Sequence, residues 1–290
     1  MIIARRLITL SKPRIIVLLV LTALCGSWKA AGGSPDWATL SVVAGAGTLA
    51  AAGANTINQG IDADIDAVMR RTRSRPVPSK EIGPRVAIGI GSLFVSLAVG
   101  TMWLAANPLA GQLTLAAAVV YVFVYSLMMK RKSWNNIVIG GAAGAFPPLI
   151  GSAAVSGSID APGLYMFVLV FFWTPPHFWA LSILLKEDYS AAKVPMLASV
   201  AGTKATVRQI MLYVLLLLGM AWLPMASGYG GLFFGLVGTF MALYWFWLCR
   251  PLLSEEVAYR DTLRAYKFSL LYLAVVFLAF AFEPALPWYV

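Results

Sequence analysis

The chain has 290 residues, of which 60% are hydrophobic and only 12% are charged, and its net charge is +10. This composition excludes an ordinary water-soluble domain and predicts an all-α polytopic membrane protein. Basic residues in such a protein orient the chain in the membrane, so we expect membrane lipid but no nucleic acid among its partners. Cys25 and Cys249 lie in apolar stretches without ligand spacing, and we expect no disulfide or metal site at them.

Apolar stretches recur along the chain, each close to the roughly 20 residues that a helix needs to cross a bilayer. We predict nine transmembrane helices, covering residues 14–32, 38–60, 84–106, 109–129, 136–156, 162–185, 205–226, 230–249 and 264–283. The second of them is expected to continue as a helix into the polar segment that follows it.

The loops on the two predicted sides differ sharply in charge. Of the 22 lysines and arginines, all except Lys29 fall on the side of the N-terminus, Arg5 and Arg6 among them. Since positively charged loops stay in the cytoplasm, we predict a cytoplasmic N-terminus and an outside C-terminus. Two inside loops, 67–83 and 186–204, are long and polar and follow the second and sixth spans. This arrangement suggests two related four-helix halves with a ninth helix added, and two loops that cap one site.

The end of the second span carries the most specific group of polar residues. Asn58, Asp62 and Asp66 are spaced four apart and so lie roughly on one face of a helix, whereas Asp64 points largely the other way. Two carboxylates at the mouth of a buried helix stay ionised at low cost only with a cation between them. Mg²⁺ suits this place, because it accepts one or two carboxylates and keeps other positions for water and phosphate. The alternative is an ordinary charged helix end at the water interface.

Basic and acidic residues near this face extend the predicted site. Arg71 and Arg75 follow at once, and arginines are the usual clamp for a diphosphate. The second long loop carries Lys186-Glu187-Asp188-Tyr189, which could hold another Mg²⁺ or the same diphosphate, or could be an ordinary interfacial loop. The run Lys130-Arg131-Lys132 is expected to act as topological charge alone. Tyr121 and Tyr125 could reach the site, but the sequence does not demand it.

His177 is the only histidine in the chain. It precedes Lys186 by nine residues and would lie about 13 Å deeper along a helix, where ionisable groups are expensive and usually functional. A core histidine bonded to a carbonyl that Pro175-Pro176 frees is the alternative. These prolines, with Pro147-Pro148, predict kinks that open a cavity between helices. Three nearby aromatic residues could wall a flat aromatic ligand or simply pack: Trp173, Phe178 and Trp179.

The spacing of Asn58, Asp62 and Asp66 resembles the first motif of the UbiA-type intramembrane prenyltransferases, and within them the chain looks like the heme branch, the heme O synthases. The resemblance rests on five stretches: SKPRIIVLLVLTALCG, ANTINQGIDADIDAVMRRTRSRP, NIVIGGAAGAFPPLIGSAAVSG, FFWTPPHFWALSILLKEDYSAAKVPML and YKFSLLYLAVVF. The third and fourth look specific to the heme branch rather than to quinone-pathway relatives.

This resemblance implies a single UbiA-type domain over residues 1–290, with nine transmembrane helices around a central cavity. It implies farnesyl diphosphate and heme b (protoheme IX) as substrates, Mg²⁺ as cofactor, and heme O and diphosphate as products. A downstream heme-modifying enzyme or a terminal oxidase assembly is a further candidate partner. The resemblance matches Asn58, Asp62 and Asp66 to the Mg²⁺–diphosphate motif, Asn55, Arg71, Arg75 and His177 to polar positions of the heme branch, and Lys186, Asp188 and Tyr189 to the second polar motif.

The chain departs from the family pattern at three places, and two alternative functions stay open. The second polar motif lacks the two-aspartate form of other members, which leaves one or two Mg²⁺ ions possible. Ala63 stands where an arginine is common, and Lys193 where a glycine is common. The acceptor could be another aromatic ring, such as a hydroxybenzoate or a chlorophyll-type ring, although the heme-branch stretches disfavour this. A transporter with acidic gating residues is less consistent with acids clustered at one face beside arginines.

The start of the chain, MIIARRLITLSKPR, is short, cationic and poor in serine, and it leads straight into the first apolar span. We therefore expect neither a cleaved signal peptide nor an organelle transit peptide. Together with the resemblance, this predicts a multi-pass protein of the bacterial cytoplasmic (inner) membrane.

Overall fold

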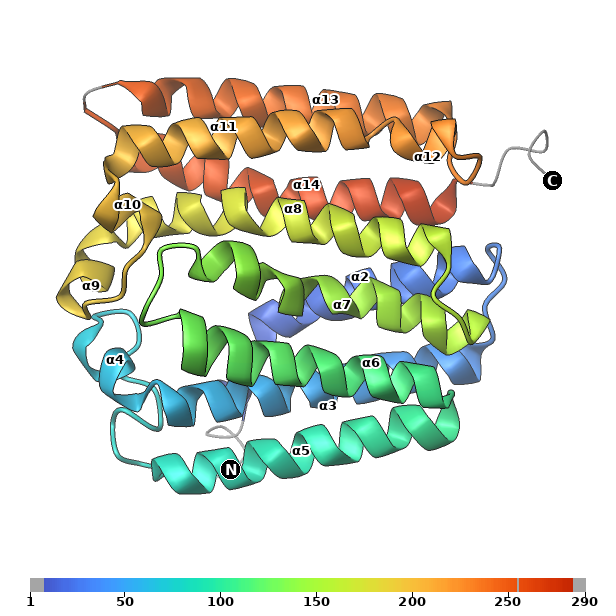
Figure 1. The fold of residues 1–290 in the computed structure, drawn as a ribbon, viewed down its shortest axis with the longest axis horizontal. Helices are drawn as coiled ribbons and strands as arrows, with labels where there is room; N and C mark the ends of the chain where they lie inside the picture. The colour runs from blue at the N-terminus through green and yellow to red at the C-terminus, as the bar shows by residue number, and fades with distance from the viewer. Residues whose placement is uncertain (1–7, 255, 284–290) are drawn as a thin grey trace.

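The computed structural model describes residues 8–254 and 256–283, so Arg5 and Arg6 of the charge pattern lie outside the described residues. Within this part, nine helices are long and apolar enough to cross a membrane, and no residue is in a strand. They are α2 (Pro13–Ala30), α3 (Trp37–Ile61), α5 (Pro84–Ala105), α6 (Pro108–Val119) continued by η1 (Val120–Met129), α7 (Asn136–Ser156), α8 (Ala161–Leu184), α11 (Gly202–Met220) with α12 (Leu223–Ala226), α13 (Leu232–Cys249) with η2 (Arg250–Leu253), and α14 (Tyr259–Phe282). Figure 1 shows them lying side by side. The prediction of nine spans is confirmed.

Local signals in the sequence fix several helix starts at the end of the bundle opposite the long polar loops. Asp36, Asn107 and Asp160 are N-caps, and each side chain accepts the backbone N–H three residues later, at 2.9, 2.9 and 2.7 Å respectively. Such caps satisfy amide groups that a helix start leaves without partners. Helix capping therefore explains two of the few charges in the loops at this end, Asp36 and Asp160.

Helix α2 connects helices from the early and the late parts of the chain, because it contacts α3, α7, α8 and α14. Its contact with α7 brings the two backbones together. A Cβ at Gly26 would collide with the carbonyl oxygen of Pro148, and one at Gly151 would collide with that of Ala23. Only glycine allows such an approach.

The largest cluster of buried apolar residues lies between α8, α11, α13 and α14. Other large apolar side chains, such as those of Leu104 and Phe240, are exposed on the outer surface of the bundle.

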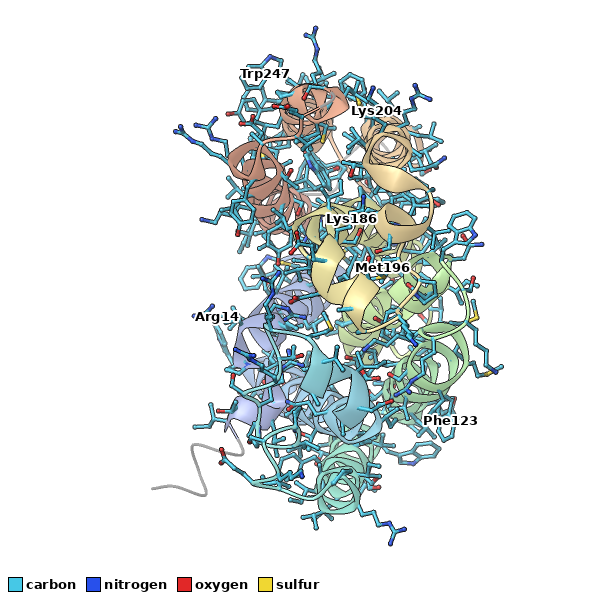
Figure 2. All side chains as sticks on the ribbon, turned by 90° about the vertical axis from the view of Figure 1, so that its left-hand side faces the viewer. Arg14, Phe123, Lys186, Met196, Lys204 and Trp247 are labelled. Carbon is cyan, nitrogen blue, oxygen red and sulfur yellow. The ribbon has the colours of Figure 1, made fainter. Side chains whose placement is uncertain are left out.

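Two short helices, α4 (Ala63–Val68) and α9 (Lys186–Ala191), lie at the same end of the bundle, on the left of Figure 1. Figure 2 looks onto this end and shows Lys186 near its middle, with Phe123 and Trp247 toward the rim. Arg70 joins the two loops through ion pairs with Glu187 at 2.8 Å and Asp188 at 3.1 Å. The prediction that loops 67–83 and 186–204 lie on one face is confirmed, and the ion pairs of Arg70 show that the two loops also meet there.

The second span does not continue unbroken into the polar segment, contrary to our expectation. Helix α3 ends at Ile61, α4 begins at Ala63, and Asp62 between them has φ −93° and ψ 13°. Aspartate is a poor interior helix residue because its side chain competes for backbone hydrogen bonds. The Asp62 amide still donates to the Asn58 carbonyl at 2.9 Å, and the Asp66 amide to the Asp62 carbonyl at 2.8 Å. The three polar residues therefore keep a common face across the break.

Candidate active site

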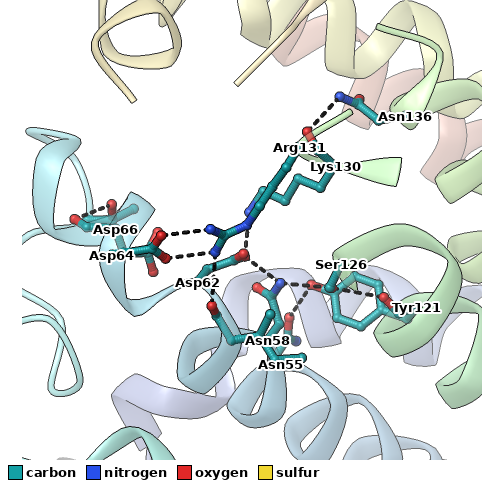
Figure 3. A network of polar contacts seen from close by, with 12 residues as sticks. Asn55, Asn58, Asp62, Asp64, Asp66, Tyr121, Ser126, Lys130, Arg131 and Asn136 are labelled. Carbon is teal, nitrogen blue, oxygen red and sulfur yellow. Dashed lines mark hydrogen bonds and ion pairs between the residues drawn. The ribbon is translucent and has the colours of Figure 1, made fainter. Parts of the chain in front are cut away.

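The face formed by Asn58, Asp62 and Asp66 points into the protein, as the spacing predicts. Their exposed fractions are 4%, 1% and 4%. The Asn58 amide donates to Asp62 Oδ2 at 2.6 Å and to the Ser126 hydroxyl at 3.1 Å (Figure 3). Buried carboxylates are stable only when charged partners and hydrogen bonds surround them.

Cations from three separate segments supply these partners. Asn58 accepts from Lys12 Nζ at 2.9 Å, Asp62 pairs with Lys130, and Asp66 pairs with Arg75 at 2.8 Å. The sequence pointed to Arg75 alone, because Lys12 and Lys130 are 46 and 68 residues away from their partners. The site is therefore a cluster of two carboxylates, one amide and three cations.

Lys12 is held at this site by an unusual backbone conformation. Its φ of 54° lies in the left-handed region, which residues other than glycine rarely adopt and which persists only where surrounding structure holds it. The preceding segment is anchored by Gln59, whose Nε2 donates to the Leu10 carbonyl at 2.7 Å. Burial, together with the neighbouring charges of Arg75 and Lys130, lowers the pKa of Lys12 to about 7.

The run Lys130-Arg131-Lys132 is more than topological charge, and that expectation was wrong for two of its members. Lys130 pairs with Asp62, and the guanidinium of Arg131 makes two hydrogen bonds of 2.7 Å to Asp64. Arg131 holds the pKa of Asp64 below its usual value. The carboxylate of Asp64 is 65% exposed and lies away from the buried face, which confirms the predicted direction of this residue.

A π-helical segment, η1, forms the wall opposite α3. Its Tyr121 hydroxyl donates to Asn55 Oδ1 at 3.3 Å, and its Ser126 hydroxyl donates to the Tyr121 carbonyl five residues earlier at 2.9 Å. Tyr125 stacks on Tyr121 with ring centroids 5.7 Å apart. Wide helical turns of this kind are rare and occur frequently at functional sites. Nothing in the sequence signals the π turn, which is why the positions of Ser126 and Lys130 were not predicted.

The donor set at this face suits a divalent cation. Asp62 Oδ1 is buried and has no hydrogen-bond partner among the described residues. Buried acceptors normally have a partner, so this oxygen is open to bind a further group. The described part of the chain contains no group of three histidine, cysteine, aspartate or glutamate residues at one point. Mg²⁺ needs only one or two carboxylates when water and phosphate complete its shell. Two carboxylates beside an amide therefore fit a Mg²⁺ that arrives with a diphosphate.

The second polar motif is tied to the first loop. Asp188 is buried, pairs with Arg70, and accepts from the Arg71 amide at 3.4 Å. Tyr189 is also buried, which raises its pKa to about 12, and the charge of Arg71 lies close enough to affect it. Lys186 begins α9 and is exposed, with no ion pair inside the described residues. The carboxylate of Asp188 is thus already engaged, and a second Mg²⁺ there stays a prediction.

Deeper in the bundle, His177 lies in an aromatic stack. Trp173 is stacked on one side at 4.4 Å between centroids and Tyr266 at 5.0 Å, while Phe178 meets the ring edge-on at 5.5 Å. His177 Nδ1 and the Ser269 hydroxyl are 2.6 Å apart. The sequence pointed to His177, Trp173 and Phe178 but not to the two residues from α14, because the contact spans about 90 residues of chain.

The other predicted aromatic, Trp179, does not join this stack. It packs edge-on against Tyr213 of α11 at 5.1 Å between centroids. Phe178 instead links the stack to the polar end, since its ring meets His177 edge-on and also packs against the apolar cluster that contains Met69 and Tyr189 of the two loops. The two parts of the predicted site, at the loops and at His177, are thus neighbours.

Comparison with known proteins agrees with this arrangement. A sequence profile described as the UbiA prenyltransferase family matches residues 19–271. The chain is 43% identical over 282 residues to a protoheme IX farnesyltransferase of Thermus thermophilus, covering 97% of this chain and 46% of that protein. It is 43% identical over 288 residues to the protoheme IX farnesyltransferase of Alkalilimnicola ehrlichii, covering 98% and 93%. The chain therefore spans about half the length of the Thermus relative and nearly all of the other.

Solved structures share the fold. A structure of digeranylgeranylglyceryl phosphate synthase superposes with a TM-score of 0.78 at 18% identity, covering 98% of this chain and 99% of that one. A UbiA homolog from Archaeoglobus fulgidus bound to DMAPP and Mg²⁺ gives 0.72 at 16% identity, covering 96% and 99%. At such identities the likeness concerns the fold alone. The profile and the near-full-length relatives show that this multi-pass membrane protein belongs to the UbiA prenyltransferase family.

Proposed function

We propose that the protein transfers a farnesyl group from farnesyl diphosphate to a vinyl group of heme b, with addition of water, to give heme O and diphosphate. The observation that carries the proposal is the buried face of Asn58, Asp62 and Asp66. One oxygen of Asp62 has no hydrogen-bond partner there, and the face is paired with three cations, Lys12, Lys130 and Arg75. The names of the 43% identical relatives and the stack around His177 support heme as the acceptor.

Asp62 and Asp66, with Asn58 as a neutral ligand, would hold Mg²⁺, which supplies charge neutralisation of the bound diphosphate. Arg71, Arg75 and Lys186 stabilise the negative charge that develops on the leaving diphosphate. Lys12 and Lys130 add to this positive field.

The reaction begins when the C1–O bond of farnesyl diphosphate breaks, giving diphosphate and an allylic cation. The vinyl C=C of heme attacks C1, and water then adds to the resulting carbocation and loses a proton, leaving a hydroxyl group. The apolar helices around the site hold the farnesyl chain and keep bulk water away from the cation. His177 ligates the heme iron, and the other substrate contacts are assigned to Asn55, Asp188, Tyr189, Trp173 and Trp179.

We also propose the setting of this activity. Residues 1–290 form one UbiA-type domain in a bacterial cytoplasmic membrane, with the N-terminus and the polar end of the bundle in the cytoplasm, because the basic residues gather there. A central cavity between the helices receives the prenyl chain. The product passes to a downstream heme-modifying enzyme or a terminal oxidase assembly.

A turnover assay on purified protein tests the proposal. Farnesyl diphosphate, Mg²⁺ and heme b are supplied, and the products are read by mass spectrometry. We expect a heme species heavier by a farnesyl group plus water, and its loss with EDTA. Diphosphate release without a prenylated heme would move the acceptor to another aromatic ring. No reaction with any prenyl diphosphate, in protein shown to be folded, would overturn the prenyltransferase assignment.

A further inference from the structure

Ser269 on α14 makes contacts with both rings of the pair Trp173 and His177 on α8. Its backbone carbonyl accepts a hydrogen bond from Trp173 Nε1 at 2.8 Å, and its hydroxyl lies 2.6 Å from His177 Nδ1. Ser269 is fully buried. One residue of α14 therefore fixes both members of a stacked pair on another helix.

The direction of the hydrogen bond between Ser269 and His177 follows from a count of hydrogens. A serine hydroxyl has one hydrogen to donate and two lone pairs that accept. The Ser269 hydroxyl donates its hydrogen to the Tyr266 carbonyl one turn earlier, at 2.6 Å. It can therefore only accept from the imidazole, so His177 carries its proton on Nδ1.

The other ring nitrogen of His177, Nε2, is then unprotonated and has a free lone pair. Nε2 has no hydrogen-bond partner among the described residues. It is also not one of the fully buried polar atoms without a partner, so this nitrogen keeps some exposure. The residue keeps 7% of its surface exposed. A neutral imidazole whose first nitrogen is held by a hydrogen bond, and whose second is free, is the arrangement found in metal-ligating histidines.

We infer that Ser269 is a positioning residue, which holds His177 as the Nδ1–H tautomer so that Nε2 coordinates the iron of the bound heme. The inference rests on the proposed function for its ligand, because heme is the acceptor proposed above. The tautomer itself does not depend on that proposal. Stacking between Trp173 and Tyr266 fixes the plane of the ring, and Ser269 fixes which nitrogen is protonated.

The single histidine allows a direct test of the tautomer. Protein labelled with ¹⁵N-histidine has one imidazole, so its two nitrogen signals need no further assignment. We expect a protonated Nδ1 and an unprotonated Nε2 in the wild-type protein. In Ser269→Ala the Nδ1 proton loses its acceptor, and we expect the Nε2–H form to gain population. A protonated Nε2 in the wild-type protein would overturn the inference.

Heme binding provides the second readout. The absorption and electron paramagnetic resonance spectra of ferric heme added to the protein should show an imidazole ligand, which His177→Ala removes. Ser269→Ala should weaken heme binding by about 10-fold or more, as loss of a partner behind a ligating histidine does. Ser269→Thr, which keeps the hydroxyl, should restore the spectrum.

Ser182→Ala is the matched control. Ser182 is also fully buried and donates to a carbonyl three residues earlier, at 2.8 Å, but has no histidine partner. Its heme affinity should stay within about twofold of wild type. A heme spectrum that His177→Ala leaves unchanged, or an affinity that Ser269→Ala lowers no more than Ser182→Ala, would overturn the inference. Intact ligation without farnesyl transfer would instead defeat the proposed function alone.

Discussion

The two short helices at the polar end, α4 and α9, have the same local construction and different roles. Each has 6 residues, follows a transmembrane helix after one intervening residue, and carries two acids in its first turn. Around α4, Asp62 and Asp66 are buried and paired with cations from separate parts of the chain. On α9, Glu187 and Asp188 pair with one arginine of the loop that follows α4.

On the proposed function, this difference separates a reaction site from a loop contact. The acids at α4 are surrounded by positive charge yet leave one oxygen of Asp62 without a hydrogen-bond partner, an arrangement that suits the proposed cation and diphosphate. The acids at α9 have their partner already, and that partner comes from the first loop. We therefore expect α9 to hold the two loops together over the site. The mutations below test this division, because they should affect chemistry at α4 and binding at α9.

The largest effect should follow from Asp62→Asn or Asp66→Asn. Either change removes a proposed metal carboxylate, and we expect turnover to fall about 10³-fold or more while the protein stays folded. Asp64→Asn is the matched control, since Asp64 lies on the same stretch but is exposed and bound to Arg131. Single-turnover rates with farnesyl diphosphate and Mg²⁺ measure the difference. Near-normal rates in both Asp62 and Asp66 variants would contradict the assignment of the metal.

A smaller loss should follow from Lys130→Met. The change leaves Asp62 without its cation and weakens the field around the diphosphate, so we expect turnover to fall about 10²-fold. Lys132→Met, in the same run but exposed, should keep nearly full activity. If the two variants lose activity equally, the run acts through topology alone, as the sequence suggested.

At α9 we expect Asp188→Asn to raise KM for farnesyl diphosphate by about tenfold with little change in kcat, because a charged hydrogen-bond acceptor for the first loop is lost. Glu187→Gln, whose carboxylate is 85% exposed, should change KM by no more than about twofold. Steady-state kinetics across substrate concentrations separate KM from kcat. A fall in kcat like that of Asp62→Asn would show that Asp188 takes part in the chemistry, and the division between the helices would fail.

The sequence predicted those features that depend on local spacing. Apolar length defined the nine spans, and the four-residue spacing defined the common face of Asn58, Asp62 and Asp66. Partners brought in from distant segments were not predictable. The left-handed backbone conformation of Lys12 and the π-helical segment before Lys130 bring these two lysines to the site, and no pattern in the sequence indicates either feature.

A lysine in a conformation that favours glycine offers a last and smaller test. Lys193, two residues after the end of α9, has φ 54°, which lies in the left-handed region that favours glycine. Because glycine adopts this conformation without strain, Lys193→Gly should raise Tm by about 2–4 °C, with activity unchanged. Lys193→Ala removes the charge but keeps the strain, so it should give no such rise. An equal rise in Tm in both variants would assign the effect to the charge of Lys193 rather than to its backbone conformation. Electrostatic repulsion of that charge near the C-terminal end of α9 would then be what lowers the stability of the wild-type protein.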